Sequence, residues 1–131
     1  MDKDFEQPSE LASDDEFILA KTAKGRVVRL IWSVVSWVEI EGRTLRLHTI
    51  TGDSYWLRGT LKSLEQQWGK YGHKRVGKNL MVFAPRIEEL RKRADGYAVY
   101  IGDGLGGGEF PVSRRKAREI KQQLQEKNDF L

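Results

Sequence analysis

The chain contains no cysteine, which excludes disulfide bonds, thiolate metal sites and cysteine nucleophiles. It also lacks a long apolar run: the most apolar stretch, residues 30–38, is far shorter than the ~20 residues that a membrane-spanning helix needs, and two serines interrupt it. The N-terminus has neither the cationic start nor the apolar segment of a signal peptide. These absences predict a soluble, cytoplasmic protein without membrane insertion. Its 131 residues suffice for one domain with its own core.

Residues with catalytic or metal-binding chemistry are scarce. The chain has two histidines, His48 and His73, in separate segments, and it has no H-E-x-x-H motif, P-loop or nucleophile elbow. Residues 102–107 match the G-x-G-x-x-G spacing of dinucleotide-binding proteins. That fingerprint must open a helix, however, whereas an expected strand containing Pro111 follows here. The sequence therefore predicts no enzyme activity, no catalytic residue, no cofactor and no metal site.

The formal net charge of +4 conceals an uneven distribution of charge. Residues 1–16 hold seven acids and one lysine, and we interpret this stretch as an acidic, disordered tail. The other 22 lysines and arginines and 12 acids lie in residues 17–131, which we interpret as a single basic domain. Such a domain favours a polyanionic partner, which is usually nucleic acid and less often a membrane surface.

Short strands separated by glycine turns fill the first half of the chain. Residues 17–20 and 27–32 predict a hairpin, and residues 35–41, 44–50 and 55–58 predict three more strands. Apolar and polar residues alternate through residues 45–48, as in a strand with one buried face. The four tryptophans are assigned to the core because each has apolar neighbours. The pattern indicates a sheet that folds over on itself.

Helical patterns occur near residues 61–68 and 114–126. Thr60 and Ser113 are the expected N-caps of these helices, since a side-chain oxygen there can accept from a free N–H of the first turn. Residues 97–101 and 109–112 predict two further strands that pair with each other.

A basic block lies between the two helices. Residues 70–93 hold eight cations and two acids, and we interpret the block as a phosphate-contacting loop. Within it, residues 86–93 are expected to form a single helical turn.

Three consecutive cations, Arg114, Arg115 and Lys116, open the last helix. A helix N-terminus carries partial positive charge and favours acidic side chains, so cations there are mildly unfavourable. The arrangement suits an external anion, which the free N–H groups would also bind. The alternative is that these are solvated surface cations, and the residues alone leave both open.

Residues 17–124 resemble the LytTR DNA-binding domain of bacterial transcription regulators. The most specific piece is Phe-Pro-Val-Ser-Arg-Arg at residues 110–115, and residues 37–39 with 45–49 match a second characteristic stretch of the family. The resemblance implies a mainly β fold of the β-rich α+β class, an elongated multi-stranded antiparallel β-sandwich. It also implies that loops, rather than a recognition helix, enter successive major grooves of duplex DNA.

The resemblance further implies three DNA-contacting regions, at a turn near residue 43, a loop near residue 78 and the start of the last helix. Ser113 would cap that helix, Arg114 would contact guanine O6 and N7, and lysines and arginines beside it would neutralise phosphates. The implied contact residues are Arg43, Thr44, Leu45, Lys78, Asn79, Ser113, Arg114, Arg115 and Lys116.

The chain departs from the family pattern at two places. The central motif usually has histidine after an arginine and an aliphatic residue, and this chain has Gly77 there; Phe83 replaces a usual asparagine. The resemblance therefore does not imply base recognition by the loop that follows Gly77. The residues before Phe17 are too few for the receiver domain that most members carry, so we expect a stand-alone regulator that a partner kinase does not phosphorylate.

The sequence thus predicts a bacterial transcription regulator that binds double-stranded DNA at promoter repeats. A second copy on the DNA and a regulatory protein are further candidate partners. One alternative is a protein–protein interaction module whose basic face docks on an acidic partner, which the altered loop at Gly77 supports. Another is a protein that binds RNA or single strands, which would need exposed aromatic residues between cations.

Overall fold

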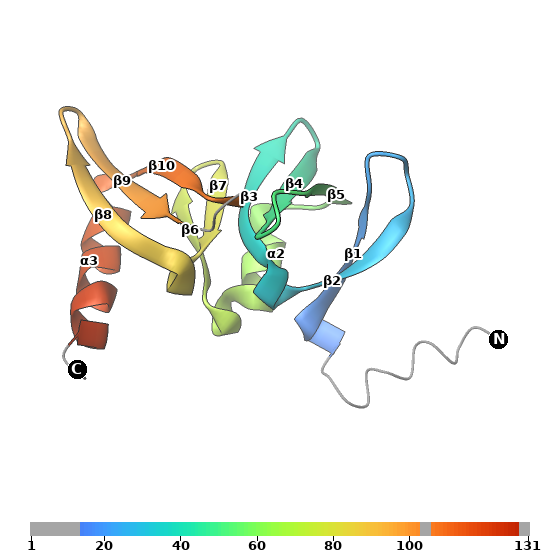
Figure 1. Cartoon of the computed structure of the whole chain (residues 1–131), viewed down its shortest axis with the longest axis horizontal. Helices are drawn as coiled ribbons and strands as arrows, with labels where there is room; N and C mark the ends of the chain where they lie inside the picture. Colours follow the sequence, from blue (N-terminus) through green and yellow to red (C-terminus); the bar gives the residue numbers. More distant parts are fainter. Residues whose placement is uncertain (1–13, 103–105, 129–131) are drawn as a thin grey trace.

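The structure, a computed structural model, describes residues 14–102 and 106–128. These residues form an elongated molecule with ten strands in two antiparallel sheets and two α-helices (Figure 1). The predicted β-rich α+β class is confirmed. In the described ranges, no helix is long and apolar enough to cross a membrane.

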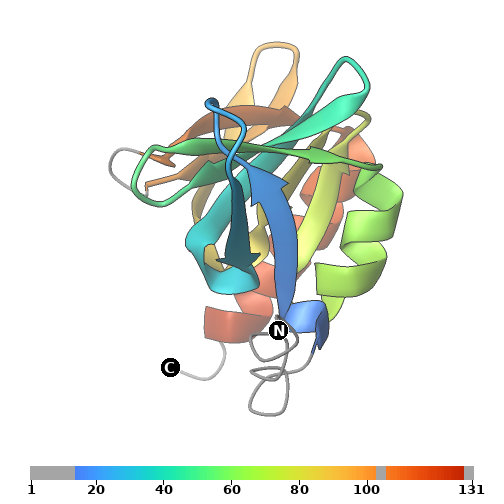
Figure 2. The same ribbon diagram turned by 90° about the vertical axis from the view of Figure 1, so that its right-hand side faces the viewer.

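The larger sheet has seven strands in the order β2-β1-β5-β4-β3-β7-β6. β1 pairs with β5 only through Lys21 and Trp56, so the β1–β2 hairpin diverges from the rest of the sheet (Figure 2). The predicted strands of the first half are confirmed to within two residues. The strands are β1 (Phe17–Lys21), β2 (Val27–Ile31), β3 (Val35–Glu41), β4 (Thr44–Thr49), β5 (Ser54–Arg58), β6 (His73–Gly77) and β7 (Leu80–Phe83).

The smaller sheet has three strands, β8 (Ile87–Arg93), β9 (Gly96–Ile101) and β10 (Gly108–Val112), in the order β10-β9-β8. The predicted pairing of β9 with β10 is confirmed. Pro111, which has no N–H to donate, lies on the edge strand β10, where a proline is tolerated. Residues 102–107 are thus followed by the strand β10. The dinucleotide-binding fingerprint would require a helix at this position.

The helical turn expected over residues 86–93 is wrong. A single 3-10 turn covers Ala84–Arg86, and residues 87–93 form β8, which pairs with β9 along its length. Ile87 is buried opposite Ile101, and Leu90 packs opposite Val99. Pairing with a buried neighbour strand thus decides the conformation of this charged segment.

Both helices begin at the predicted caps. In α2 (Leu61–Trp68), the Thr60 hydroxyl accepts from the N–H of Ser63 at 3.1 Å. In α3 (Arg114–Asn128), the Ser113 hydroxyl accepts from the N–H of Lys116 at 3.2 Å.

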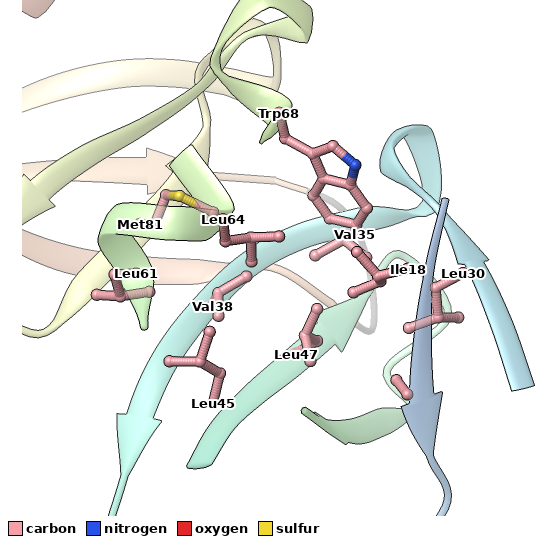
Figure 3. Close-up of a cluster of buried hydrophobic side chains, with 11 residues drawn as sticks. Ile18, Leu30, Val35, Val38, Leu45, Leu47, Leu61, Leu64, Trp68 and Met81 are labelled. Atoms are coloured by element: carbon pink, nitrogen blue, oxygen red, sulfur yellow. The ribbon is translucent and has the colours of Figure 1, made fainter. Parts of the chain in front are cut away.

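Two hydrophobic cores hold the molecule together. The first lies between the larger sheet and α2, where Trp68 and Leu64 face Val35 and Val38 of β3 and Ile18 of β1 (Figure 3). The second lies between β6 and β7, the smaller sheet and α3, and it contains Val76, Val82, Val99, Phe110 and Ile120.

Trp37 links the two sheets. Its Nε1–H donates to the backbone oxygen of Gly106 at 3.2 Å, and its ring lies 4.5 Å from the ring of Phe110. Trp32, Trp37 and Trp68 pack in the cores as predicted. Trp56 does not: it is half-buried outside both clusters, and its Nε1–H donates to a Glu41 carboxylate oxygen at 2.7 Å.

The described structure begins inside the stretch assigned to the acidic tail. Asp14–Glu16 form a 3-10 turn, where Asp15 pairs with Lys70 and accepts from the Tyr71 hydroxyl at 3.0 Å. These three residues therefore belong with the folded body. The rest of the proposed tail, residues 1–13, lies outside the described residues.

Candidate nucleic-acid interface

Two long-range backbone hydrogen bonds bring the three predicted regions together. The N–H of Ile40, at the end of β3, donates to the oxygen of Asn79 at 3.2 Å. The N–H of Ser113, just before α3, donates to the oxygen of Val76 at 3.3 Å. The β6–β7 turn therefore lies between the β3–β4 turn and the start of α3. All three lie on the upper side of the molecule as drawn in Figure 1.

The β3–β4 turn presents Arg43 to solvent. Gly42 has a φ of +63°, which favours glycine, and the Thr44 hydroxyl donates to the oxygen of Glu41 at 2.9 Å. The carboxylate of Glu41 is occupied by Trp56 and by Arg46, whose Nη1 is 3.6 Å away. Arg43 is consequently exposed and has no acidic partner among the described residues.

Leu45 does not belong to this surface. Its side chain is 1% exposed and lies in the first core with Val38 and Leu61 (Figure 3). The alternation of β4 turns Leu45 inward, because it shares a face with Leu47. We therefore remove Leu45 from the implied DNA contacts.

The β6–β7 turn is held by Arg75. Its guanidinium donates to the oxygen of Lys78 at 2.9 Å, while its backbone N–H donates to the Glu65 carboxylate of α2 at 3.0 Å. Lys78 and Asn79 are exposed at the tip. A Cβ added at Gly77 would meet nothing within 4 Å, so there is open space beside this turn.

The start of α3 presents two exposed arginines. Arg114 and Arg115 form no ion pair with any residue in the described part of the chain. Lys116 differs, because its Nζ lies 3.6 Å from a Glu119 oxygen that Lys74 also approaches, at 3.7 Å. Lys116 is therefore partly neutralised and is a weaker candidate for a phosphate contact than Arg115.

The basic block of residues 70–93 is not one phosphate-contacting loop. It spans β6, β7 and β8, and most of its cations have partners within the protein. Arg86, for example, donates to the oxygen of Ser33 at 3.0 Å, and Arg91 and Arg93 both pair with Glu109. Of its eight cations, only Lys78 and Lys92 have no partner among the described residues.

The family model of the LytTr DNA-binding domain matches residues 25–125. This chain belongs to the LytTR family. A LytTR domain is a DNA-binding module of transcription regulators, and DNA is therefore the partner that membership of the family implies.

A solved structure supports the fold of this LytTR domain. The LytTr DNA-binding domain of a response regulator from Bacillus cereus superposes with a TM-score of 0.69 at 16% sequence identity, covering 83% of this chain and 96% of that chain. No curated protein sequence gives a significant match.

Both histidines of this LytTR domain pack against aromatic rings. His48 stacks on Trp37 with ring centroids 3.6 Å apart, and its Nε2 lies 2.7 Å from a Glu39 oxygen. Burial lowers the pKa of His48 despite that carboxylate. His73 is buried and bonds the oxygen of Val35 through Nε2, and its burial lowers the pKa to about 4. Within the described ranges, no group of three His, Cys, Asp or Glu residues could hold a metal ion.

Sequence reasoning missed the residues that support the turns. Arg75 and Glu65 hold the β6–β7 turn, and Trp56 and Arg46 occupy the acid beside Arg43. Arg46 and Trp56 lie opposite each other on one face of the sheet. The alternation of residues along the two strands is the sequence signal that could have indicated this pair.

Proposed function

We propose that this LytTR domain regulates transcription by binding duplex DNA sequence-specifically through loops in the major groove. The β3–β4 turn, the β6–β7 turn and the start of α3 are the contacting regions. The observation that supports this most is the pair of backbone hydrogen bonds, Ile40 to Asn79 and Ser113 to Val76, because it fixes all three regions in one row. A row of exposed loops can follow successive turns of the groove.

The chemistry of the exposed side chains supports a division of roles. Arg114, unpaired at a helix start, suits bidentate contact with guanine, and the Asn79 amide suits adenine. Arg43, Lys78 and Arg115 are exposed cations that suit phosphates. Thr44 and Ser113 add hydroxyl groups, although each already makes one hydrogen bond within the protein. Lys116 contributes charge that Glu119 partly cancels.

We also propose an organisation for the whole chain. Residues 17–131 act as one DNA-binding domain, preceded by an acidic segment whose last residues, Asp14–Glu16, pack on that domain. The protein acts in the cytoplasm at promoter repeats, where a second copy binds the neighbouring half-site. A regulatory protein would supply the controlling signal.

Selection from random duplex DNA, followed by binding measurements with variants, tests this function. Arg114→Ala should weaken binding to the selected site by about 1–3 kcal/mol, while affinity for scrambled duplex changes little. Lys62→Ala is the control, since Lys62 is also an exposed cation but lies on α2. Equal losses on selected and scrambled duplex would contradict the role of Arg114. Failure to select any duplex would instead favour a protein-interaction module.

A further inference from the structure

We propose that the β1–β2 hairpin is a fourth DNA-contacting element, which binds backbone phosphates on the flank of the site beyond the β3–β4 turn. This inference rests on the proposed function and extends its surface. Its residues are Lys24 and Arg26, at the tip of the hairpin.

The charge of the hairpin is of one sign. Residues 17–31 contain four cations, Lys21, Lys24, Arg26 and Arg29, and no acid. Lys24 and Arg26 are exposed, and neither pairs with an acid in the part of the chain that the structure describes. The tip therefore presents uncompensated positive charge to an external anion.

The opposite end of the molecule shows a contrasting arrangement. The β8–β9 hairpin also carries cations, but Arg91 bonds Glu89 and Glu109, and Arg93 pairs with the same Glu109. Arg91 additionally lies over the ring of Tyr100, 4.2 Å from its centroid. Lys92 is thus the one cation of this hairpin without a partner among the described residues, whereas the tip of β1–β2 carries two. We therefore assign the additional contact to the β1–β2 end.

The hairpin tip has a defined backbone. The N–H of Thr22 donates to the oxygen of Arg26 at 2.8 Å, and the N–H of Gly25 donates to the oxygen of Thr22 at 2.9 Å. The hydroxyl of Thr22 accepts from the N–H of Arg26 at 3.1 Å. Gly25 has a φ of +86°, as such a turn requires. The bonds leave both cationic side chains free while they fix the turn that carries them.

The placement of the hairpin extends the row of contacting regions. Figures 1 and 2 show the tip of β1–β2 on the same side of the molecule as the β3–β4 turn, the β6–β7 turn and the start of α3. Along the long axis it follows the β3–β4 turn, at the end away from α3. Phosphates continue along the duplex on either side of the bases that are recognised, so cations in this position meet the backbone and contribute affinity without sequence preference.

Protection of the sheet edge is the competing role for these cations. β2 is the edge strand of the larger sheet, and Leu19 and Val27 of the hairpin are 62% and 59% exposed. Lysines on an exposed edge prevent pairing with other chains. That role predicts more aggregation on removal of the cations and no change in DNA binding.

The test uses the full chain and three duplexes: the selected site alone, the site extended by about one helical turn on one side, and the site extended on the other. The wild-type protein should bind one extended duplex more tightly than the site alone. Lys24→Ala/Arg26→Ala should lose that gain. On that duplex its slope of log affinity against log salt should become shallower by about 1.8, because two phosphate contacts contribute ~0.9 each. Lys62→Ala should retain both the gain and the slope.

Equal slopes for the double variant and the wild type on all three duplexes would overturn the inference. The inference would also be overturned if the double variant aggregated more than the wild type but bound all three duplexes equally well. The proposed function stands in either case if Arg114→Ala still loses its preference for the selected site. If Arg114→Ala kept the wild-type preference for the selected site on every duplex, the proposed function itself would be contradicted.

Discussion

The backbone oxygen of Asn79 accepts a hydrogen bond from the N–H of Ile40, which joins the β6–β7 turn to the end of β3 across 39 residues of sequence. A backbone bond of this kind does not depend on the side chain of Asn79. The position of the turn is thus built into the sheet, and its exposed side chains remain available for a partner.

Arg75 should act on DNA binding through the turn that it supports. We expect Arg75→Lys to keep the charge but lose the bond to Lys78, because an ammonium on a different stem does not reproduce the guanidinium geometry. Hydrogen exchange at the amides of residues 77–80 should accelerate, and affinity for the selected duplex should fall by about 1 kcal/mol. Wild-type affinity combined with faster exchange would show that the order of this turn is irrelevant to binding.

Gly77→His should be tolerated and should change base preference. A Cβ at this position meets nothing within 4 Å, and replacing a glycine within a strand typically stabilises by about 0.5–1 kcal/mol. The variant should melt at or above the wild-type temperature and should select a different base in the part of the site that this turn contacts. A loss of more than about 1 kcal/mol in the free energy of unfolding would contradict the open environment of Gly77.

Gly106→Ala should be strongly destabilising. A Cβ there would overlap the backbone oxygen of Thr49, so the main chain must move and the bond from Trp37 to Gly106 would be strained. We expect a loss of about 1–3 kcal/mol in urea unfolding, as for other overpacked sites. Gly77→Ala is the matched control and should leave stability unchanged or raise it by up to about 1 kcal/mol. Similar stability for the two variants would mean that Gly106 does not hold the sheets together.

The free energy of unfolding should fall as the pH decreases from about 6.5 toward 4. His73 is kept neutral in the folded protein, since its pKa is lowered from 6.5 to about 4, whereas in the unfolded chain it binds a proton below pH 6.5. As the pH falls, His73 therefore binds a proton in the unfolded state before it does so in the folded state. The free energy of unfolding should be lower by roughly 2–3 kcal/mol near pH 4.5 than at neutral pH. His48, whose pKa burial also lowers, contributes in the same direction.

Urea unfolding at several pH values separates the two histidines. His73→Gln retains a side-chain N–H that can donate to Val35, but it has no proton to gain. Its stability should vary less between pH 6.5 and 4.5 than that of the wild type, and His48→Gln is the comparison. If the stability of His73→Gln varied with pH as much as that of the wild type, other groups would cause the pH dependence.

The sequence predicted those elements whose pattern is local. The alternation around Leu45 and Leu47 predicted β4, and Thr60 and Ser113 predicted the helix starts. The same alternation indicated that Leu45 faces the core, which the family resemblance alone did not. By contrast, Ile87 and Leu90 in β8 have a helix-like spacing, and only pairing with Ile101 and Val99 of β9 makes the segment a strand.

The candidate site was predicted as separate pieces. Arg43, Lys78 and Arg114 were found by resemblance, but their arrangement depends on contacts between distant segments that a sequence pattern does not show. The basic block was misinterpreted for the same reason, because the acids that neutralise Arg91 and Arg93 come from another part of the chain.

The most direct measurement of the central claim is an NMR titration of the full chain with the selected duplex, monitored at every assigned backbone amide. We predict that amides of residues 42–44, 77–79 and 113–116 shift together and saturate at the same DNA concentration, while those of α2 around Lys62 and Ser63 do not move. Shifts confined to one of the three regions, or centred on α2, would contradict a single DNA-binding surface formed by the two turns and the start of α3.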